Sequence, residues 1–185
     1  MASPAVGQLG VLADLFEDAL LLVEPESVCV LGVAGGNGLD RVRPSVTRRI
    51  VGVDIHPGYL NEARRRCPEA ELHVADLASA RLEMEPVDLV HAALVFEHAG
   101  VGLCLDNAVA LTRRALSVVL QLASESSAGV GASPFASLQA LQAEFRLIEP
   151  EWLCHELACR GFRLSHQERR ALPAGKSFWF GVFVR

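Results

Sequence analysis

The stretch SVCVLGVAGGNGLD, residues 27–40, decides how the rest of the sequence is interpreted. It begins as an apolar run and then places three glycines within the four positions 35–38. A loop that leaves a buried strand and enters a helix presents backbone N–H groups to a ligand at the carboxyl edge of a parallel sheet. The same residues also suit a tight turn that binds nothing. The surrounding sequence has to distinguish these two interpretations.

Short apolar runs bounded by turn residues recur along the chain. Their continuous hydrophobicity predicts strands that are covered on both faces, as in a parallel sheet between helices. The predicted strands are residues 28–33, 50–53, 72–75, 87–94 and 116–122. The predicted helices are residues 39–48, 58–67, 106–115, 133–145 and 149–162. Their alternation indicates βαβ units with right-handed crossovers.

The two ends of the chain depart from this alternation. Residues 1–24 have the apolar spacing of a helix that packs on the core, and residues 124–133 are predicted to form a flexible loop. Residues 162–172 alternate loosely between apolar and polar side chains, and FWFGVFVR, residues 178–185, favours a strand. Their connection is too short for a parallel crossover, so these last two strands must be antiparallel. The sequence predicts a doubly wound α/β sheet in a single domain, residues 1–185.

Composition excludes several classes of protein. A hydrophobic share of 51% indicates a folded core, while a net charge of −5 gives no basic face for nucleic acid. No apolar run approaches the roughly 20 residues of a membrane span, and no secretory signal precedes the first helix, so we expect a cytoplasmic protein. The five cysteines occur singly, which argues against a metal site. Monomer and homodimer both remain open.

Two acidic residues follow predicted strands. Asp54 ends the second apolar run, where its carboxylate can accept hydrogen bonds from both hydroxyls of a ribose. The alternative is a helix N-cap, since Pro57 suits the start of a helix. Asp76 ends the third run, where it can accept a hydrogen bond from an adenine amino group while the backbone N–H of Leu77 meets the ring. Together with the glycine loop, these residues favour an adenosine-containing ligand.

The glycine spacing distinguishes two classes of such ligand. A dinucleotide fold requires G-x-G-x-x-G, but counting from Gly32 the sequence has Ala34 and Asn37 at the other two glycine positions. An antiparallel last strand is also unusual in a nicotinamide-binding domain. A nicotinamide-dependent oxidoreductase is therefore disfavoured.

With these features, the sequence resembles the class I S-adenosylmethionine-dependent methyltransferases of the small-molecule type. The stretches that carry the resemblance are VLGVAGGNG (30–38), VGVDIHPGYL (51–60), HVADLA (73–78), DLVHAALVFEHAG (88–100) and FWFGVFVR (178–185). The resemblance implies a Rossmann-like seven-stranded sheet of order 3-2-1-4-5-7-6, with strand 7 antiparallel and helices on both faces. It also implies S-adenosyl-L-methionine as cofactor and S-adenosyl-L-homocysteine as product.

The resemblance further implies a role for individual residues. The residues assigned to the cofactor site are Gly32, Ala34 and Gly36 at the methionine and ribose part, Asp54 at the ribose, Ile55, Asp76 and Leu77 at the adenine, and the Ala93 carbonyl at the cofactor's amino group. Methyl transfer is expected to be an in-line displacement. No large insertion forms a deep cap over the substrate, so we expect a small-molecule acceptor or, as the alternative, an exposed group on a larger molecule. From its place after the fourth strand, His98 is the candidate general base, and Glu97 could orient it or the substrate. The alternative is that His98 only caps or packs this loop.

A second hypothesis is a non-catalytic binding module with the same fold. The family has an acidic residue where this chain has Val30 and a glycine where it has Ala34. His91, Trp152 and Trp179 are interpreted as core residues, because each lies within an apolar strand or helix pattern.

Overall fold

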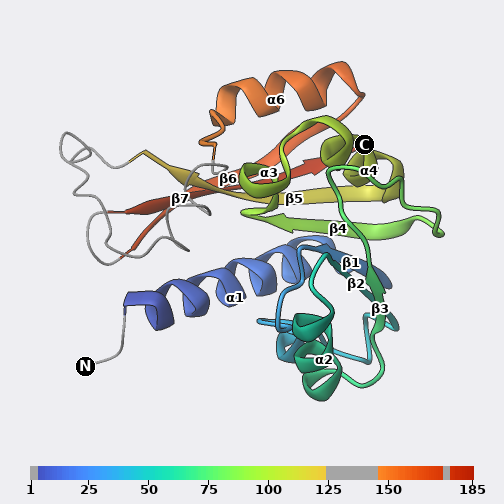
Figure 1. Cartoon of the computed structure of the whole chain (residues 1–185). Helices are drawn as coiled ribbons and strands as arrows, with labels where there is room; N and C mark the ends of the chain where they lie inside the picture. The colour runs from blue at the N-terminus through green and yellow to red at the C-terminus, as the bar shows by residue number, and fades with distance from the viewer. Residues whose placement is uncertain (1–3, 124–145, 173–175) are drawn as a thin grey trace.

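The computed structural model describes residues 4–123, 146–172 and 176–185. Its centre is a seven-stranded sheet of order β3-β2-β1-β4-β5-β7-β6 (Figure 1). The strands are β1 (Ser27–Leu31), β2 (Arg49–Asp54), β3 (Glu71–Val74), β4 (Val87–Ala93), β5 (Thr112–Leu122), β6 (Arg163–Ala171) and β7 (Ser177–Val184). β1 to β5 pair in parallel, whereas β7 runs antiparallel to both of its neighbours, β5 and β6. The predicted strand order and the antiparallel seventh strand are confirmed.

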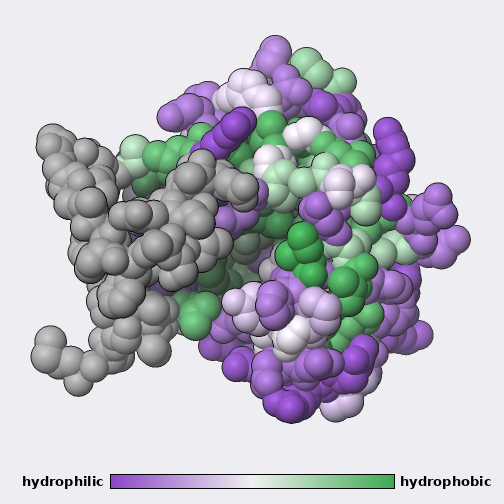
Figure 2. Space-filling model, in the orientation of Figure 1, coloured by the Kyte–Doolittle hydropathy of each residue, from purple (hydrophilic) through white to green (hydrophobic). Residues whose placement is uncertain are grey.

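Helices cover both faces of the sheet, as predicted (Figure 1). The helices are α1 (Pro4–Val23), η1 (Leu39–Arg41), α2 (Pro57–Arg66), α3 (Val95–Ala99), α4 (Gly102–Leu111) and α6 (Pro150–Cys159). One hydrophobic core joins the sheet to α1, η1 and α2, and a second core joins its other face to α3, α4 and α6. The surface over α2 is mostly hydrophilic (Figure 2), as expected for a helix that turns only Leu60 and Ala63 inward. Because β1 to β5 are parallel, their carboxyl ends lie at one edge of this layer.

The N-terminal helix packs on the sheet, as its apolar spacing indicates. Leu15, Phe16 and Ala19 are at most 2% exposed. The Phe16 ring lies 4.8 Å from the ring of His91, and the Nδ1 atom of His91 lies 2.8 Å from the Ser117 hydroxyl oxygen. His91 is therefore the core histidine that the sequence predicts, and it is satisfied by one hydroxyl.

Two predicted elements differ in the structure. The helix predicted at residues 39–48 is only the short η1, because Pro44 removes a backbone donor and disfavours helical geometry at Arg43. The helix predicted at residues 106–115 begins and ends earlier, and β5 starts directly at Thr112, whose hydroxyl donates to the Ala108 carbonyl. The predicted helix 133–145 and the predicted loop 124–133 lie outside the described residues.

The two tryptophans have different environments. Trp179 on β7 is 6% exposed and belongs to a core, as predicted. Trp152 is 42% exposed, so its assignment to the core is wrong. α6 turns Leu153 and Leu157 to the sheet, and Trp152 lies outside that buried stripe.

No helix in the described part of the chain is long and apolar enough to cross a membrane.

Candidate functional site

The predicted cofactor residues come together at the carboxyl edge of β1 to β4. They lie at or just after the strand ends: Gly32, Ala34 and Gly36 follow β1, Asp54 ends β2 and Ile55 follows it, Asp76 and Leu77 follow β3, and Ala93 ends β4. Parallel pairing of β1 with both β2 and β4 places these ends side by side. The edge next to β1, where the strand order reverses, is where open α/β sheets bind ligands.

The glycine loop has positive φ angles at four positions, Gly32, Ala34, Gly36 and Gly38. Gly32 and Gly36 have positive φ angles of 68° and 79°, which glycine adopts without steric cost. A side chain on Gly36 would come within 3.0 Å of the backbone of Ala63, so the loop lies directly against α2. Ala34 has φ 46°, a left-handed conformation that costs an ordinary residue about 1–2 kcal/mol. The loop is strained at the position where the family has glycine.

Asp54 fixes this loop to the second strand. One carboxylate oxygen, Oδ2, accepts the backbone N–H of Ala34 at 2.8 Å, and Oδ1 accepts the N–H of His56 at 2.8 Å. The residue is 8% exposed. Each oxygen keeps a second lone pair, so the carboxylate could still accept a ribose hydroxyl from the edge. The N-cap of α2 is His56, so Asp54 lies two residues before the cap position that the alternative interpretation requires.

Exposed apolar groups stand beside Asp54. Ile55 is 63% exposed, and Tyr59 on α2 is 53% exposed. The Tyr59 ring stacks at 4.6 Å on the ring of His56, in a tilted geometry. An exposed isoleucine and a ring pair at a strand end form a surface on which a flat base can pack. The sequence interpretation included Ile55 but missed Tyr59, although its position two residues after Pro57, in the first turn of the predicted helix, could have indicated it.

Asp76 lies just after β3, at the same edge of the sheet. Its Oδ2 accepts the Ser79 hydroxyl at 2.7 Å, and its Oδ1 accepts the N–H of Ala78 at 2.9 Å. The hydrogen bond from Ser79, and then the one from Ala78, lower the pKa of Asp76, so it is an acceptor at neutral pH. Leu77 is 5% exposed and belongs to a core. Only its backbone is suited to read a ligand.

The fourth strand ends in a left-handed residue. Ala93 is half-buried at the edge, and Leu94 after it has φ 58°. The N–H of Leu94 donates to the Val119 carbonyl at 2.9 Å. This turn directs the chain into α3, which carries both candidate acid–base residues.

Glu97 is a carboxyl buried at the end of β5. It is 1% exposed, and its Oε1 accepts the N–H of Gln121 at 2.8 Å. Its Oε2 is buried and has no hydrogen-bond partner among the described residues. Burial raises the pKa of Glu97 from 4.5 to about 7. His98 is exposed on the same short helix, so the structure separates two neighbouring candidates into different environments.

Two further features bear on the site. Val30, at the other departure from the family pattern, is 8% exposed within the core that joins the sheet to α1. No group of three or more His, Cys, Asp or Glu residues able to hold a metal ion occurs in the ranges that the structure describes.

A family of known proteins matches part of this sequence. The sequence model described as "Methyltransferase domain" matches residues 28–117, which include the whole candidate cofactor edge. Residues 28–117 are thus similar to methyltransferase domains, and the sheet has the Rossmann-like methyltransferase fold. This finding confirms the resemblance inferred from the glycine loop and the acidic residues. The domain model ends inside β5 and leaves the α6–β6–β7 part of the fold to the structural comparison.

Among curated proteins, the domain is 29% identical over 85 residues to an uncharacterized methyltransferase-like protein of Schizosaccharomyces pombe. The matched part covers 46% of this chain and 33% of that protein, so it spans about a third of the relative's length.

Solved structures share the fold over nearly the whole chain. Magnesium protoporphyrin IX methyltransferase (ChlM) from Synechocystis PCC 6803, with bound SAH, matches with a TM-score of 0.72 at 15% identity, covering 97% of this chain and 84% of that one. The [4+2]-cyclase SpnF matches with a TM-score of 0.68 at 13% identity, covering 94% and 80%. Since a methyltransferase and a cyclase share the fold, the reaction has to be argued from the site.

The strain at Ala34 predicts that Ala34→Gly stabilises the methyltransferase domain. Glycine removes the left-handed penalty, although its more flexible unfolded chain offsets part of the gain. The control, Ala78→Gly in an exposed turn, should lower the free energy of unfolding by about 0.5–1 kcal/mol. We expect Ala34→Gly to be about 1–2 kcal/mol more stable than this control in urea titrations. Equal stability of the two variants would contradict the strain.

Burial of Glu97 predicts a stability that depends on pH. Between pH 4.5 and about 7 the folded state keeps a proton that the unfolded state has released, so the free energy of unfolding falls as the pH rises. Glu97→Gln should remove up to about 3 kcal/mol of this fall. The buried His91, with a pKa lowered to about 3, acts in the opposite direction below about pH 6.5. The quantity to measure is therefore the free energy of unfolding of wild type minus that of Glu97→Gln, at each pH.

Thermal and urea unfolding at pH 5, 6, 7 and 8 give this difference directly. Glu83→Gln serves as control, because it removes an exposed carboxyl. A wild-type minus Glu97→Gln difference that stays constant with pH would show that Glu97 is ionised throughout.

Proposed function

We propose that the domain binds S-adenosyl-L-methionine at the carboxyl edge of β1 to β4 and transfers its methyl group to a small-molecule acceptor. The observation that carries the proposal is the bond between Asp54 and the Ala34 N–H, which sets a glycine loop and an acidic strand end at one edge. Ile55 and Tyr59 supply an apolar surface beside them, and Asp76 supplies an acceptor on the next strand. These are the groups that an adenosine with a charged tail requires.

The residues present fit this cofactor with one condition. The loop backbone would hold the methionine and ribose part, Ile55 would pack on the adenine, and Asp76 with the Leu77 N–H would bind its edge. Asp54 already accepts two backbone N–H groups. A ribose would therefore have to share the carboxylate with the loop. In this arrangement, loop position and ribose binding depend on the same side chain.

When bound, the cofactor would supply a methyl group carried by a sulfonium. A lone pair of the acceptor would form the new bond to the methyl carbon, while the carbon–sulfur bond breaks in line and its electron pair returns to sulfur. The protein orients the acceptor and receives the proton that the methylated atom loses. Glu97 is suited to take this proton, because its Oε2 lacks a described partner and its pKa lies near neutrality. His98, exposed on the same helix, would pass the proton to water.

The alternative is a binding module with no turnover. The strained Ala34 and the doubly engaged Asp54 favour it, because both restrict the loop that would hold the cofactor. Cofactor binding followed by a search for turnover separates the two functions.

Calorimetric titration with S-adenosyl-L-methionine and S-adenosyl-L-homocysteine tests the cofactor. Asp54→Ala should weaken binding tenfold or more and lower the free energy of unfolding by about 1–3 kcal/mol, because two backbone N–H groups lose their acceptor. Asp40→Ala, which removes an exposed acid near the same loop, should change neither. Absence of binding to wild type at millimolar ligand would rule out the proposed function.

Transfer of a radiolabelled methyl group tests the chemistry. The acceptors to supply are small amines, phenols and carboxylic acids, each with the cofactor at saturation. With any acceptor that is methylated, Glu97→Gln should lower kcat at least tenfold with little change in KM, and should abolish the rise in rate around pH 7. His98→Gln should have a smaller effect. Cofactor binding without transfer to any acceptor would favour the binding module.

A further inference from the structure

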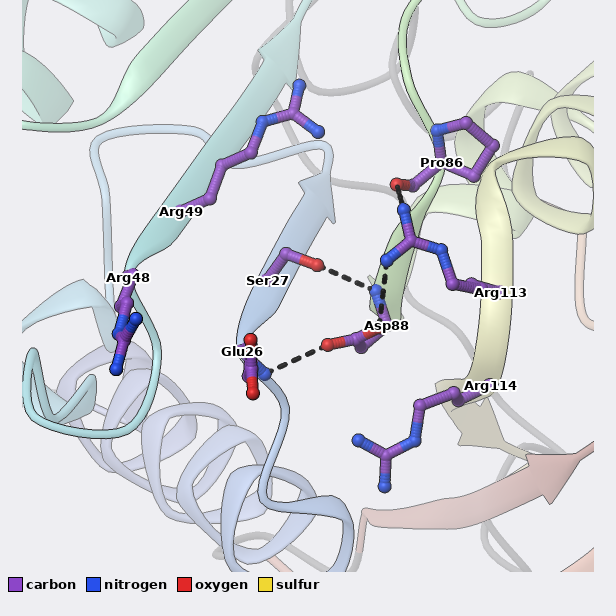
Figure 3. A pocket seen from close by; sticks show the side chains of 8 residues that line it. All are labelled: Glu26, Ser27, Arg48, Arg49, Pro86, Asp88, Arg113 and Arg114. Atoms are coloured by element: carbon purple, nitrogen blue, oxygen red, sulfur yellow. Dashed lines mark hydrogen bonds and ion pairs between the residues drawn. The ribbon is translucent and has the colours of Figure 1, made fainter.

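A pocket lies at the opposite edge of the sheet from the candidate cofactor residues. It encloses about 460 Å³ where β1, β2, β4 and β5 begin. Figure 3 shows its lining, which is Glu26, Ser27, Arg48, Arg49, Pro86, Asp88, Arg113 and Arg114. The arginines come from two Arg-Arg pairs, one just before and into β2 and one at the start of β5. Sequence analysis missed this cluster, because only parallel pairing brings the two strand starts to one edge.

Half of this positive charge is already neutralised. Arg49 forms an ion pair with Glu71 at 3.1 Å and donates to the Glu85 carbonyl. Arg113 forms an ion pair with Asp88 at 3.2 Å, and its other terminal nitrogen donates to the Pro86 carbonyl at 2.7 Å (Figure 3). These two arginines are fixed parts of the wall.

Asp88 is the buried centre of the pocket. It is 6% exposed, accepts the N–H of Glu26 at 3.0 Å, and donates its own N–H to the Ser27 hydroxyl at 2.9 Å. Its carboxylate therefore has two partners, the Glu26 N–H and Arg113, and its backbone N–H has a third. It joins the starts of β1, β4 and β5 into one rigid floor.

Arg48 and Arg114 carry the remaining positive charge. Both are exposed, and neither forms an ion pair with a carboxylate in the described ranges. Arg114 donates to the Val23 carbonyl at the end of α1, which holds its side chain in place. In Figure 3, Glu26 lies between Arg48 and Arg114. Two guanidinium groups thus face one carboxylate across an open hollow.

The basic lining extends past Arg114. A neighbouring pocket of about 580 Å³ shares Arg113 and Arg114 and also includes His166 and Arg185. Its apolar side is formed partly by Leu22, which is 52% exposed. Guanidinium groups spaced along a continuous hollow match an anion with more than one charged centre.

We propose that the pocket at the amino edge binds a small molecule bearing a diphosphate group, with Arg48 and Arg114 as the residues that contact it. A guanidinium presents two parallel N–H donors to phosphate oxygens, and two such forks across the hollow suit two linked phosphates. Arg49 and Arg113 line the wall, and Glu26 opposes binding by its charge. The site is separate from the cofactor edge and does not depend on the proposed function.

Inorganic pyrophosphate is the probe that tests this site, titrated into the full chain by calorimetry at low ionic strength. Wild type should bind it, and affinity should fall steeply as salt is raised from about 50 to 200 mM. The double variant Arg48→Gln/Arg114→Gln should bind at least tenfold more weakly. Glu26→Gln should bind at least threefold more tightly, because the opposing charge is removed. This gain of affinity is independent of any loss of stability.

The matched control is Arg64→Gln/Arg66→Gln on α2, which removes the same charge from exposed positions away from the pocket. It should bind pyrophosphate within twofold of wild type. Citrate, an anion without phosphate, should bind at least tenfold more weakly than pyrophosphate, and a nucleoside diphosphate should bind at least as tightly. No binding of pyrophosphate to wild type at about 10 mM, equal loss in both double variants, or equal affinity for citrate would overturn the proposal.

Discussion

The two hydrogen bonds that Asp54 accepts are the constraint on which the candidate site depends. One ties Ala34 of the glycine loop to the last residue of β2, so the loop lies over the carboxyl edge, and the other, from the His56 N–H, fixes the chain just before α2. A buried carboxylate that satisfies two backbone donors is costly to replace, because any apolar substitute would leave both donors without a partner. The left-handed Ala34 is tolerated because this bond and the contact of Gly36 with α2 over-determine its conformation.

Parallel pairing gives the sheet two chemically different edges. At the carboxyl edge, acids and exposed apolar groups surround a glycine loop, which suits an adenosine with a cationic tail. At the amino edge, two pairs of arginines meet around the buried Asp88, which suits an anion. Both edges are rigid, because helices hold the sheet from both faces. One layer can therefore support two sites without either disturbing the other.

Buried ionisable groups are placed differently in the two cores. His91 lies between α1 and the sheet and is satisfied by the Ser117 hydroxyl, which makes it structural. Glu97 lies on the other face and has one oxygen without a described partner, although a backbone N–H holds the other. A group that a core satisfies completely has no capacity for chemistry. The incomplete satisfaction of Glu97 is what distinguishes it as a candidate for proton transfer.

The sequence by itself determined the parallel strands and the antiparallel last strand, because local hydrophobic runs and a short connection encode them, and its resemblance to the methyltransferases implied the strand order. The cofactor residues at the strand ends stay a prediction. The sequence interpretation erred where a long-range or backbone effect prevailed: Pro44 cut a predicted helix short, and Trp152 fell outside the buried stripe of α6. Only the tertiary structure decided that Asp54 binds the loop, that Glu97 is buried, and that the two Arg-Arg pairs share a pocket. Each depends on residues far apart in sequence, which pairing of the strands brings into contact.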